Sequence, residues 1–366
     1  MSRKLASIQI IKDIQPIPDA DRIEVAVING WKCVVKKNEF RVGQKVVYFE
    51  IDSFLPCVED YEFLRASSYK NSPMLGEGFR IKAQKLRGVI SQGLILPIET
   101  CFKDCMPVCE LEEGEDVTEI LNVKKWEEPE TALIGGNPVG KRPEFIKYTH
   151  EERIQNYPEV LEEFYACDYV YATTKIDGSS HSIGIDRDGN FHATSHNLEL
   201  RDEGKKGSFY QFCKDNNLEE KLRRIMRHYD LNEIVVQGEY YGPGIQKNKL
   251  GMNKPSWRVF TVDFNGERQD LAHSRIATED YLSNIDDELV VRFVPIVWYG
   301  TGKEFKDQFP TVDSLLKAVE GDLAEVYVNH QNEGWVIRPR APKYSSVLND
   351  TLSIKVINNK YLLKEK

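Results

Sequence analysis

The chain has 366 residues, of which 41% are hydrophobic and 29% are charged. This composition is typical of a globular protein and excludes disorder throughout, while the length predicts two domains. No apolar run is long enough to cross a bilayer, and the start MSRKLASIQIIKD lacks the features of a signal peptide, so we expect no membrane partner. Seven cysteines in a chain this long do not indicate a secreted disulfide framework, which favours the cytoplasm.

The net charge of −9 is unevenly distributed along the chain. Residues 1–100 carry 15 Lys/Arg against 12 Asp/Glu, whereas residues 101–130 carry 3 against 10. A nucleic-acid partner is compatible with these values, because phosphate contacts depend on local potential and not on net charge. The acidic stretch and the turn-rich segment IGGNPVGKRP predict a linker over 121–140, between a domain at 1–120 and a domain at 141–366.

The amino-terminal part is predicted to be mainly β structure. IEVAVI, WKCVVK, KVVYFEI and GLILPI are short runs of β-branched and aromatic residues separated by turn signals. This pattern predicts a small Greek-key barrel of the OB type, a fold that often binds nucleic acids. Trp31 or Phe40 could offer an apolar surface to a strand, or the tryptophan could belong to the core. The basic residues that could follow a phosphate backbone, or simply form a solvated face, are Lys32, Lys36, Lys37, Arg41, Lys82, Lys85 and Arg87.

Three cysteines, Cys101, Cys105 and Cys109, repeat at every fourth residue. Zinc sites usually need a fourth ligand, and no matching Cys/His pair follows nearby. Pro107 also disfavours one continuous helix that carries all three thiols. We therefore favour reduced, partly buried cysteines over a structural zinc site.

The carboxy-terminal part mixes strand and helix patterns. YVYATTKI, HSIGIDRDGNFHATS, EIVVQGEYYG, RVFTVDF, VRFVPIVWYG, EGWVIRP and TLSIKVI are predicted strands. A helix is predicted in SFYQFCKDNNLEEKLRRIMRHY, and another in TVDSLLKAVEG with Thr311 or Asp313 as its cap and Gly321 at its end. Many strands with few helices predict an α+β fold. Neither a Walker A motif nor a dinucleotide fingerprint is present.

Four charged residues stand at or within predicted strands. Lys175 ends a strand and is followed by Asp177 and small residues, so its amine could meet a bound electrophile. Glu239 and Glu333 lie at the mouths of apolar strands, and Lys355 lies inside one. Each alone could be an exposed edge residue. Together they provide a lysine nucleophile, carboxylates for a divalent metal and a second cation for phosphate oxygens.

The order of these motifs resembles the covalent nucleotidyltransferase superfamily, and most closely its ATP-dependent RNA ligases with an amino-terminal OB domain. The matching elements are KIDG at 175–178, GEYYGPGIQK at 238–247, RVFTVDF at 258–264, EGWVI at 333–337, SIKVIN at 353–358 and the upstream EERIQN at 151–156. The resemblance implies an OB-type barrel followed by a ligase domain built on an ATP-grasp-like antiparallel sheet.

The resemblance also implies roles for individual residues. Lys175 would attack the α-phosphate of ATP, and Lys355 would stabilise the charge that develops there. Asp177, Glu239 and Glu333 would hold Mg²⁺ or Mn²⁺. The residues implied to contact the nucleotide are Arg153, Lys175, Ile176, Asn197, Glu239, Phe260, Val262, Glu333, Val336 and Lys355.

Three positions differ from the pattern of many relatives. Val262 stands where an aromatic residue often stacks on adenine, and Phe260 or Phe264, expected on the same strand face, could replace it. His196 stands where arginine is common. Ile357 stands where a second lysine is common, and Lys360 could substitute for it.

The function implied is an ATP-dependent RNA ligase that joins 3′-hydroxyl and 5′-phosphate ends through lysyl-AMP and adenylylated RNA, acting as a monomer in RNA repair such as nick sealing. A capping guanylyltransferase or a DNA ligase shares the same lysine chemistry, but those relatives usually carry the OB module after the catalytic domain. A binding protein with an inactive transferase fold is the alternative from another class.

Overall fold

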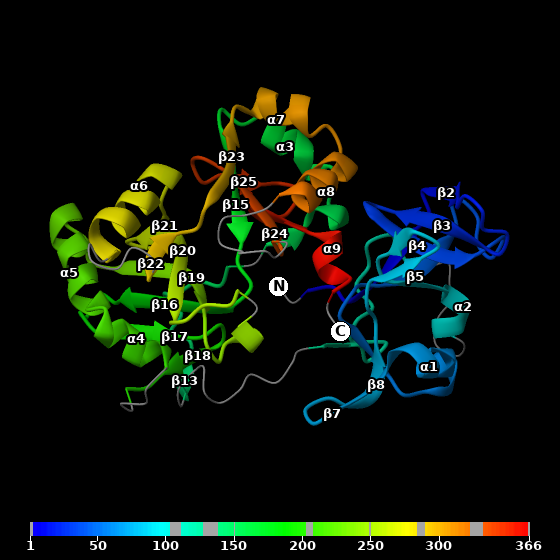
Figure 1. Cartoon of the computed structure of the whole chain (residues 1–366), viewed down its shortest axis with the longest axis horizontal. Helices are drawn as coiled ribbons and strands as arrows, with labels where there is room; N and C mark the ends of the chain where they lie inside the picture. Colours follow the sequence, from blue (N-terminus) through cyan, green and yellow to red (C-terminus); the bar gives the residue numbers. More distant parts are fainter. Residues whose placement is uncertain are drawn as a thin grey trace. The chain divides into compact units, whose positions relative to one another are not determined.

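The computed structural model describes residues 3–102, 111–126, 138–149, 151–202, 208–248, 250–283, 290–322 and 332–364. The chain forms two compact units (Figure 1). The amino-terminal unit contains Met1–Pro129 together with Gln155–Pro158 and Asn359–Lys366, and the second unit contains Glu130–Ile154 and Glu159–Asn358. Among the described residues, no helix is long and apolar enough to cross a membrane.

The amino-terminal unit consists of short, antiparallel strands around one apolar core. The strand orders are β1-β5-β11, β2-β3-β4, β12-β6-β8-β7 and β9-β10. The predicted runs at 23–28 and 31–36 form adjacent strands in full, and both are rich in residues that favour strands. The residues of the second run alternate between buried and more exposed positions. The bounds are β1 Ala6–Ile10, β2 Asp13–Pro16, β3 Ile23–Ile28, β4 Trp31–Lys36, β5 Lys45–Phe49, β6 Ser53–Pro56, η1 Glu59–Leu64, α1 Arg65–Ser68, β7 Tyr69–Ser72, β8 Gly76–Arg80, β9 Gln84–Leu86, β10 Val89–Ser91, β11 Leu94–Pro97, α2 Ile98–Cys101, β12 Lys124–Lys125 and α9 Asn359–Leu362.

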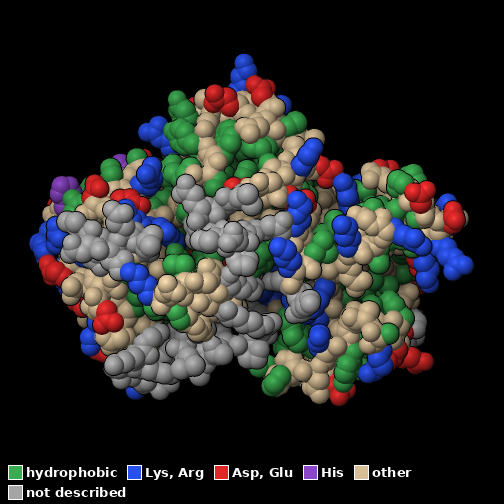
Figure 2. Space-filling view, viewed as in Figure 1, with side chains coloured by type: hydrophobic (Ala, Val, Ile, Leu, Met, Phe, Trp, Pro, Cys, Tyr) green, Lys and Arg blue, Asp and Glu red, His purple; other side chains and the backbone are tan. Residues whose placement is uncertain are grey.

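Both aromatic residues considered as an apolar surface for a nucleic acid lie inside this unit, so the alternative of a core tryptophan is the correct one. Trp31 is 1% exposed and Phe40 is buried. The Trp31 ring packs on Tyr48, and its Nε1 donates a hydrogen bond of 2.6 Å to Asn156 Oδ1. Figure 2 shows Lys and Arg side chains on this unit, with acidic side chains among them.

The second unit contains two sheets. The larger has the order β13-β18-β17-β16-β19-β20-β21, with β22 parallel to β20. The smaller has the order β14-β27-β24-β15-β23, and only its β14–β27 pair is parallel among the described strands. The bounds are β13 Pro138–Lys141, β14 Glu152–Arg153, β15 Val170–Lys175, β16 Ser179–Ile185, β17 Phe191–Thr194, β18 Leu198–Leu200, β19 Ile234–Tyr241, β20 Ser256–Phe264, β21 Glu267–Arg268, β22 Val291–Phe293, β23 Ile296–Gly300, β24 Gly334–Pro339, β25 Tyr344–Ser345, β26 Asp350–Thr351 and β27 Ile354–Ile357.

Helices cover the outer faces of both sheets (Figure 1). The helix predicted over 208–229 is two helices, because Asn217 adopts a left-handed conformation between them. The helix at 312–321 is capped by Thr311, which forms a capping box with Ser314. The bounds are η3 Ile154–Asn156, α3 Val160–Tyr165, α4 Phe209–Asp215, α5 Leu218–Tyr229, η4 Gln246–Asn248, α6 Leu271–Ile276, η5 Ala277–Leu282, α7 Gly302–Gln308 and α8 Val312–Gly321.

Candidate active site

Lys175 is the last residue of β15, and the structure places it among the acids that the sequence singled out. Its Nζ donates a hydrogen bond of 2.6 Å to Glu333 Oε1, and this carboxylate immediately precedes β24. Glu239 of β19 and Asp177 also act on the ammonium electrostatically. One lysine from the smaller sheet therefore meets carboxylates from three separate segments of the chain.

These carboxylates change the proton affinity of the lysine. Burial disfavours the ammonium, but Glu333, Glu239 and Asp177 outweigh it and raise the pKa of Lys175 above its ordinary value. Burial raises the pKa of Glu239 to about 8, although Lys175 opposes this shift. Without a ligand, Lys175 is thus a charged amine held by Glu333 and not a nucleophile.

The turn after Lys175 requires a glycine at position 178. A Cβ at this position would lie 2.5 Å from the carbonyl oxygen of Tyr240, which is a distance no side chain tolerates. The Gly178 amide also donates a hydrogen bond to Glu239, which lowers the pKa of that carboxyl. The close approach of the two backbones therefore fixes Glu239 beside Lys175.

A cavity of about 140 Å³ opens between the two sheets at Lys175. Its lining from the smaller sheet includes Thr173, Thr174, Val336 and Arg338, and that from the larger sheet includes Ser180, Glu239 and Phe260. Thr149, Glu151, Ile176, His196 and Val294 complete it. The Oγ1 atom of Thr174 is buried without a hydrogen-bond partner in the described part of the chain, as expected of a group that awaits a ligand.

A β-bulge decides which aromatic residue of β20 reaches the cavity. Gln237 pairs with Thr261 and Gly238 pairs with Val259, so Phe260 is the extra residue and the alternation of side chains is interrupted there. Phe260 lines the cavity, whereas Val262 is fully buried in the core. Phe264 is buried and packs on Tyr229. Val262 is therefore not placed to contact a base in this cavity, and of Phe260 and Phe264, which pack in the same core, only Phe260 lines it.

Four further residues predicted to act at the site lie beside the cavity or away from it. Arg153 of β14 is buried and pairs in register with Lys355 of β27, which in turn pairs with Val336. Asn197 is exposed and is not part of the lining, whereas its neighbour His196 is. Lys360 lies in α9, which groups with the amino-terminal unit, so its role as a substitute stays a prediction.

Comparisons with known proteins identify the family and the fold. A model of an OB-fold domain matches residues 5–98, and the model of the RNA ligase family matches residues 168–357, more than half of the chain. The chain belongs to the RNA ligase family. A search of curated protein sequences finds no match.

Solved structures of one RNA ligase are similar to the chain over its whole length. A mutant of the Naegleria gruberi RNA ligase without ligand has 29% sequence identity and a TM-score of 0.83, covering 99% of this chain and 98% of that one. A mutant of the same enzyme with ATP and Mn has the same identity and TM-score and covers 99% of both chains. The enzyme with PPi has 29% identity and a TM-score of 0.83, covering 100% and 99%. The predicted fold is confirmed: an OB-fold domain is followed by an α+β ligase domain.

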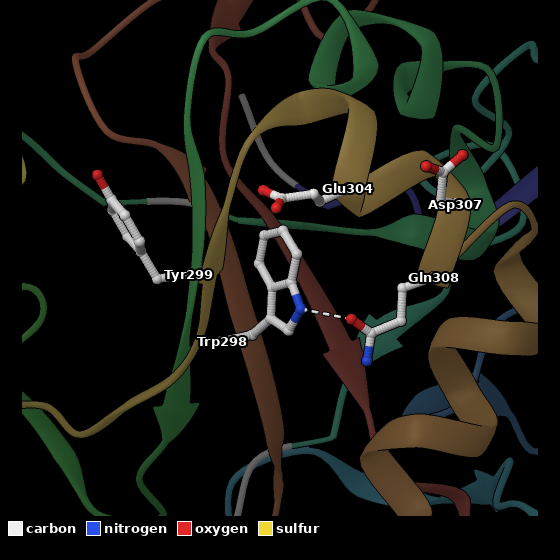
Figure 3. A pocket seen from close by; sticks show the side chains of 5 residues that line it. All are labelled: Trp298, Tyr299, Glu304, Asp307 and Gln308. Carbon is white, nitrogen blue, oxygen red and sulfur yellow. Dashed lines mark hydrogen bonds between the residues drawn. The ribbon is translucent and has the colours of Figure 1, made fainter.

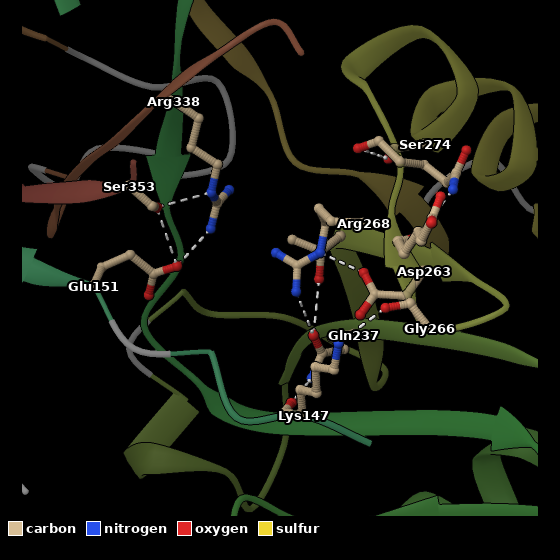
Figure 4. Close-up of polar contacts among 12 residues, drawn as sticks. Lys147, Glu151, Gln237, Asp263, Gly266, Arg268, Ser274, Arg338 and Ser353 are labelled. Carbon is tan, nitrogen blue, oxygen red and sulfur yellow. Dashed lines mark hydrogen bonds and ion pairs between the residues drawn. The ribbon is translucent and has the colours of Figure 1, made fainter. Parts of the chain in front are cut away.

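The ligase site contains a polar network that the sequence did not reveal. Arg338 donates a hydrogen bond of 2.6 Å to Glu151 Oε1 and another of 3.0 Å to Ser353 Oγ (Figure 4). Arg268 pairs nearby with Asp263 and donates to Gln237. Glu151 and Ser353 are the first residues of the elements EERIQN and SIKVIN, which also carry Arg153 and Lys355. The pairing of β14 with β27 brings them together, and no local pattern in the sequence indicates it.

Two other features of the ligase do not belong to this site. A surface hollow of about 480 Å³ is lined by Trp298, Tyr299, Glu304, Asp307 and Gln308, and the Trp298 ring donates a hydrogen bond to Gln308 (Figure 3). Cys101 is half-buried, and Cys105 and Cys109 lie outside the described residues. In the described part of the chain, no three His, Cys, Asp or Glu residues are arranged to enclose a metal ion.

Proposed function

We propose that this protein is an ATP-dependent RNA ligase that joins RNA 3′-hydroxyl and 5′-phosphate ends. The observation that carries the proposal is the placement of Lys175 at a cavity between two sheets, with Glu239, Glu333 and Asp177 around its amine. Family membership and the similarity to a ligase solved with ATP and Mn support this choice of nucleotide and metal.

Each step forms one bond and breaks one bond at phosphorus. The neutral Lys175 amine attacks the α-phosphate of ATP, so that an N–P bond forms and pyrophosphate leaves. An RNA 5′-phosphate oxygen then attacks the lysyl-AMP, which returns the lysine and gives adenylylated RNA. Finally the 3′-hydroxyl attacks that activated phosphate, forming the phosphodiester and releasing AMP.

The first step needs Lys175 to lose its proton. Even an ordinary lysine is neutral in only about one molecule in 2,500 at pH 7, and the three carboxylates disfavour the neutral form further. Carboxylates are the preferred ligands of Mg²⁺ and Mn²⁺. Glu239, Glu333 and Asp177 are not arranged to enclose an ion directly, so they would hold a divalent cation through its waters. A bound cation supplies positive charge beside the amine and the phosphate. If Glu333 accepted hydrogen bonds from the waters of such a cation, its carboxylate would stabilise the ammonium of Lys175 less.

The remaining residues would position the nucleotide. Phe260 and Val336 line the cavity and would enclose the base. Lys355 and Arg153 lie side by side on neighbouring strands and would contact the phosphates. Ile176 also lines the cavity and would contact the nucleotide. The contact of Asn197 with the nucleotide is proposed from the sequence alone.

We further propose that RNA repair, such as nick sealing, is the setting of this activity. Residues 1–120 would hold the RNA strand, 121–140 would link the domains, and 141–366 would carry the adenylyl transfer. The cysteines of the described residues are free, as expected in a reducing compartment such as the cytoplasm, and a monomer stays the expected state.

Labelling with nucleotide tests the proposal. The full-length protein is incubated with Mg²⁺ or Mn²⁺ and with ATP or GTP labelled at the α-phosphate. We expect label from ATP on the wild type and on Lys303→Ala, which changes an exposed lysine of α7, but not on Lys175→Ala. Preferential labelling by GTP would support a guanylyltransferase. Absence of label with either nucleotide would support the inactive binding protein.

A further inference from the structure

An aromatic side chain stands exposed beside the cavity. Tyr148 is 59% exposed, and its ring makes an edge contact with the ring of His196, with 5.6 Å between the centroids. His196 lines the cavity, as does Thr149, the residue after Tyr148. Tyr148 itself is not part of the lining. The tyrosine thus lies at the mouth of the cavity, outside the space proposed for ATP.

The other neighbour of Tyr148 is a buried arginine. The guanidinium of Arg142 lies 4.9 Å from the centre of the Tyr148 ring, and Arg142 is only 7% exposed. It donates hydrogen bonds to the carbonyl oxygens of Ile146, Lys147 and His196 and to the hydroxyl of Ser182. No carboxylate among the described residues pairs with it, and burial lowers the pKa of Arg142 to about 10. The ring of Tyr148 therefore rests on a cation that none of the described acids neutralises.

These bonds also hold the backbone around Tyr148 rigidly. Gln237 donates a hydrogen bond of 2.7 Å to the carbonyl oxygen of Lys147, and Lys147 Nζ donates one of 2.9 Å to that of Gly266 (Figure 4). Arg142 joins this segment to the loop that carries His196. An exposed aromatic ring on a fixed backbone loses little freedom when it binds a flat partner.

We propose that Tyr148 is a stacking platform for the nucleobase at the 5′-phosphate end of the RNA substrate. This inference rests on the proposed function, because that end must reach Lys175 after the lysine has taken up AMP. Aromatic rings stack on any base, and excess positive charge beside the ring attracts the adjoining phosphate. Tyr148 would then act in AMP transfer to RNA and not in the reaction with ATP.

Variants at Tyr148 test this separation of steps. Wild type, Tyr148→Ala and Tyr148→Phe are each charged with labelled AMP, and transfer to a 5′-phosphorylated RNA is followed as its concentration is varied. A second RNA lacks the first base. We expect equal charging of all three proteins and a loss of roughly 5- to 150-fold in kcat/KM for transfer by Tyr148→Ala, the range for base-stacking residues. Tyr148→Phe keeps the ring and should transfer like the wild type.

The abasic RNA identifies the contact. It should lower transfer by the wild type to the level of Tyr148→Ala, while that variant should use both RNAs equally. Equal transfer of the intact RNA by wild type and Tyr148→Ala, or a further loss when the variant meets the abasic RNA, would overturn the platform. A wild type that accepts no AMP from ATP would instead contradict the proposed function.

Discussion

The ion pair between Arg338 and Glu151 makes a quantitative prediction about stability. Arg338 is 7% exposed, and the pair joins β24 to the residue before β14 at the wall of the cavity. Removing one member of a buried pair costs about 3–5 kcal/mol, because the other charge stays buried without compensation. For a unit of this size, with about 2–4 °C per kcal/mol, Arg338→Met should lower the melting temperature by roughly 6–20 °C.

Thermal unfolding followed by calorimetry would measure this effect, with Glu151→Gln and the double variant as controls. The double variant leaves no unpaired charge, so its free energy of unfolding should fall by less than the sum of the two single losses. Burial raises the pKa of Glu151, but Arg338 and other cations outweigh it and lower that pKa below its ordinary value. The pair therefore stabilises the fold above the unfolded pKa of a glutamate and loses this effect as pH falls through the folded value. The difference between wild type and Arg338→Met should therefore shrink in acid. A loss below about 1 kcal/mol at pH 7, or strict additivity, would refute this reasoning.

Other predictions concern the site itself. Gly178→Ala should abolish labelling by ATP, because the new Cβ would collide with the carbonyl oxygen of Tyr240. The control Gly189→Ala, in the β16–β17 turn, should change only stability. Normal labelling of Gly178→Ala would contradict the close approach seen at Tyr240. Phe260→Ala should raise the KM for ATP about tenfold or more, and Phe260→Tyr should restore it, whereas an unchanged KM would remove Phe260 from the base site. Glu239 must lose its proton to bind a metal, and its pKa is about 8. The affinity for Mn²⁺ should therefore rise between pH 6 and 8.5. Glu239→Gln should flatten this rise in a calorimetric titration, and a rise that persists in that variant would assign it to another group.

The sequence allowed the family and its reaction to be predicted, and it singled out Lys175, Glu239 and Glu333, which lie in short motifs at strand ends and which the structure brings together. It did not predict which phenylalanine lines the cavity, since the bulge at Phe260 depends on the register between β19 and β20. The Arg338–Glu151 pair was also missed, because residues 187 positions apart meet only through strand pairing. The sequence left open whether Trp31 lies in the core or on the surface, because its partner Asn156 lies far along the chain.

The interrupted course of the amino-terminal unit matters for anyone who wishes to produce it separately. A fragment that stops at residue 129 would lack Gln155, whose carbonyl accepts from the Gly30 amide, and Asn156, which bonds to both Trp31 and Glu50. It would also lack Asn359, the partner of Gln92. Such a truncated OB fold would leave polar groups without the hydrogen-bond partners that they have in the full chain. A fusion of this unit to another enzyme would therefore need to include Gln155–Pro158 and Asn359–Lys366 as well.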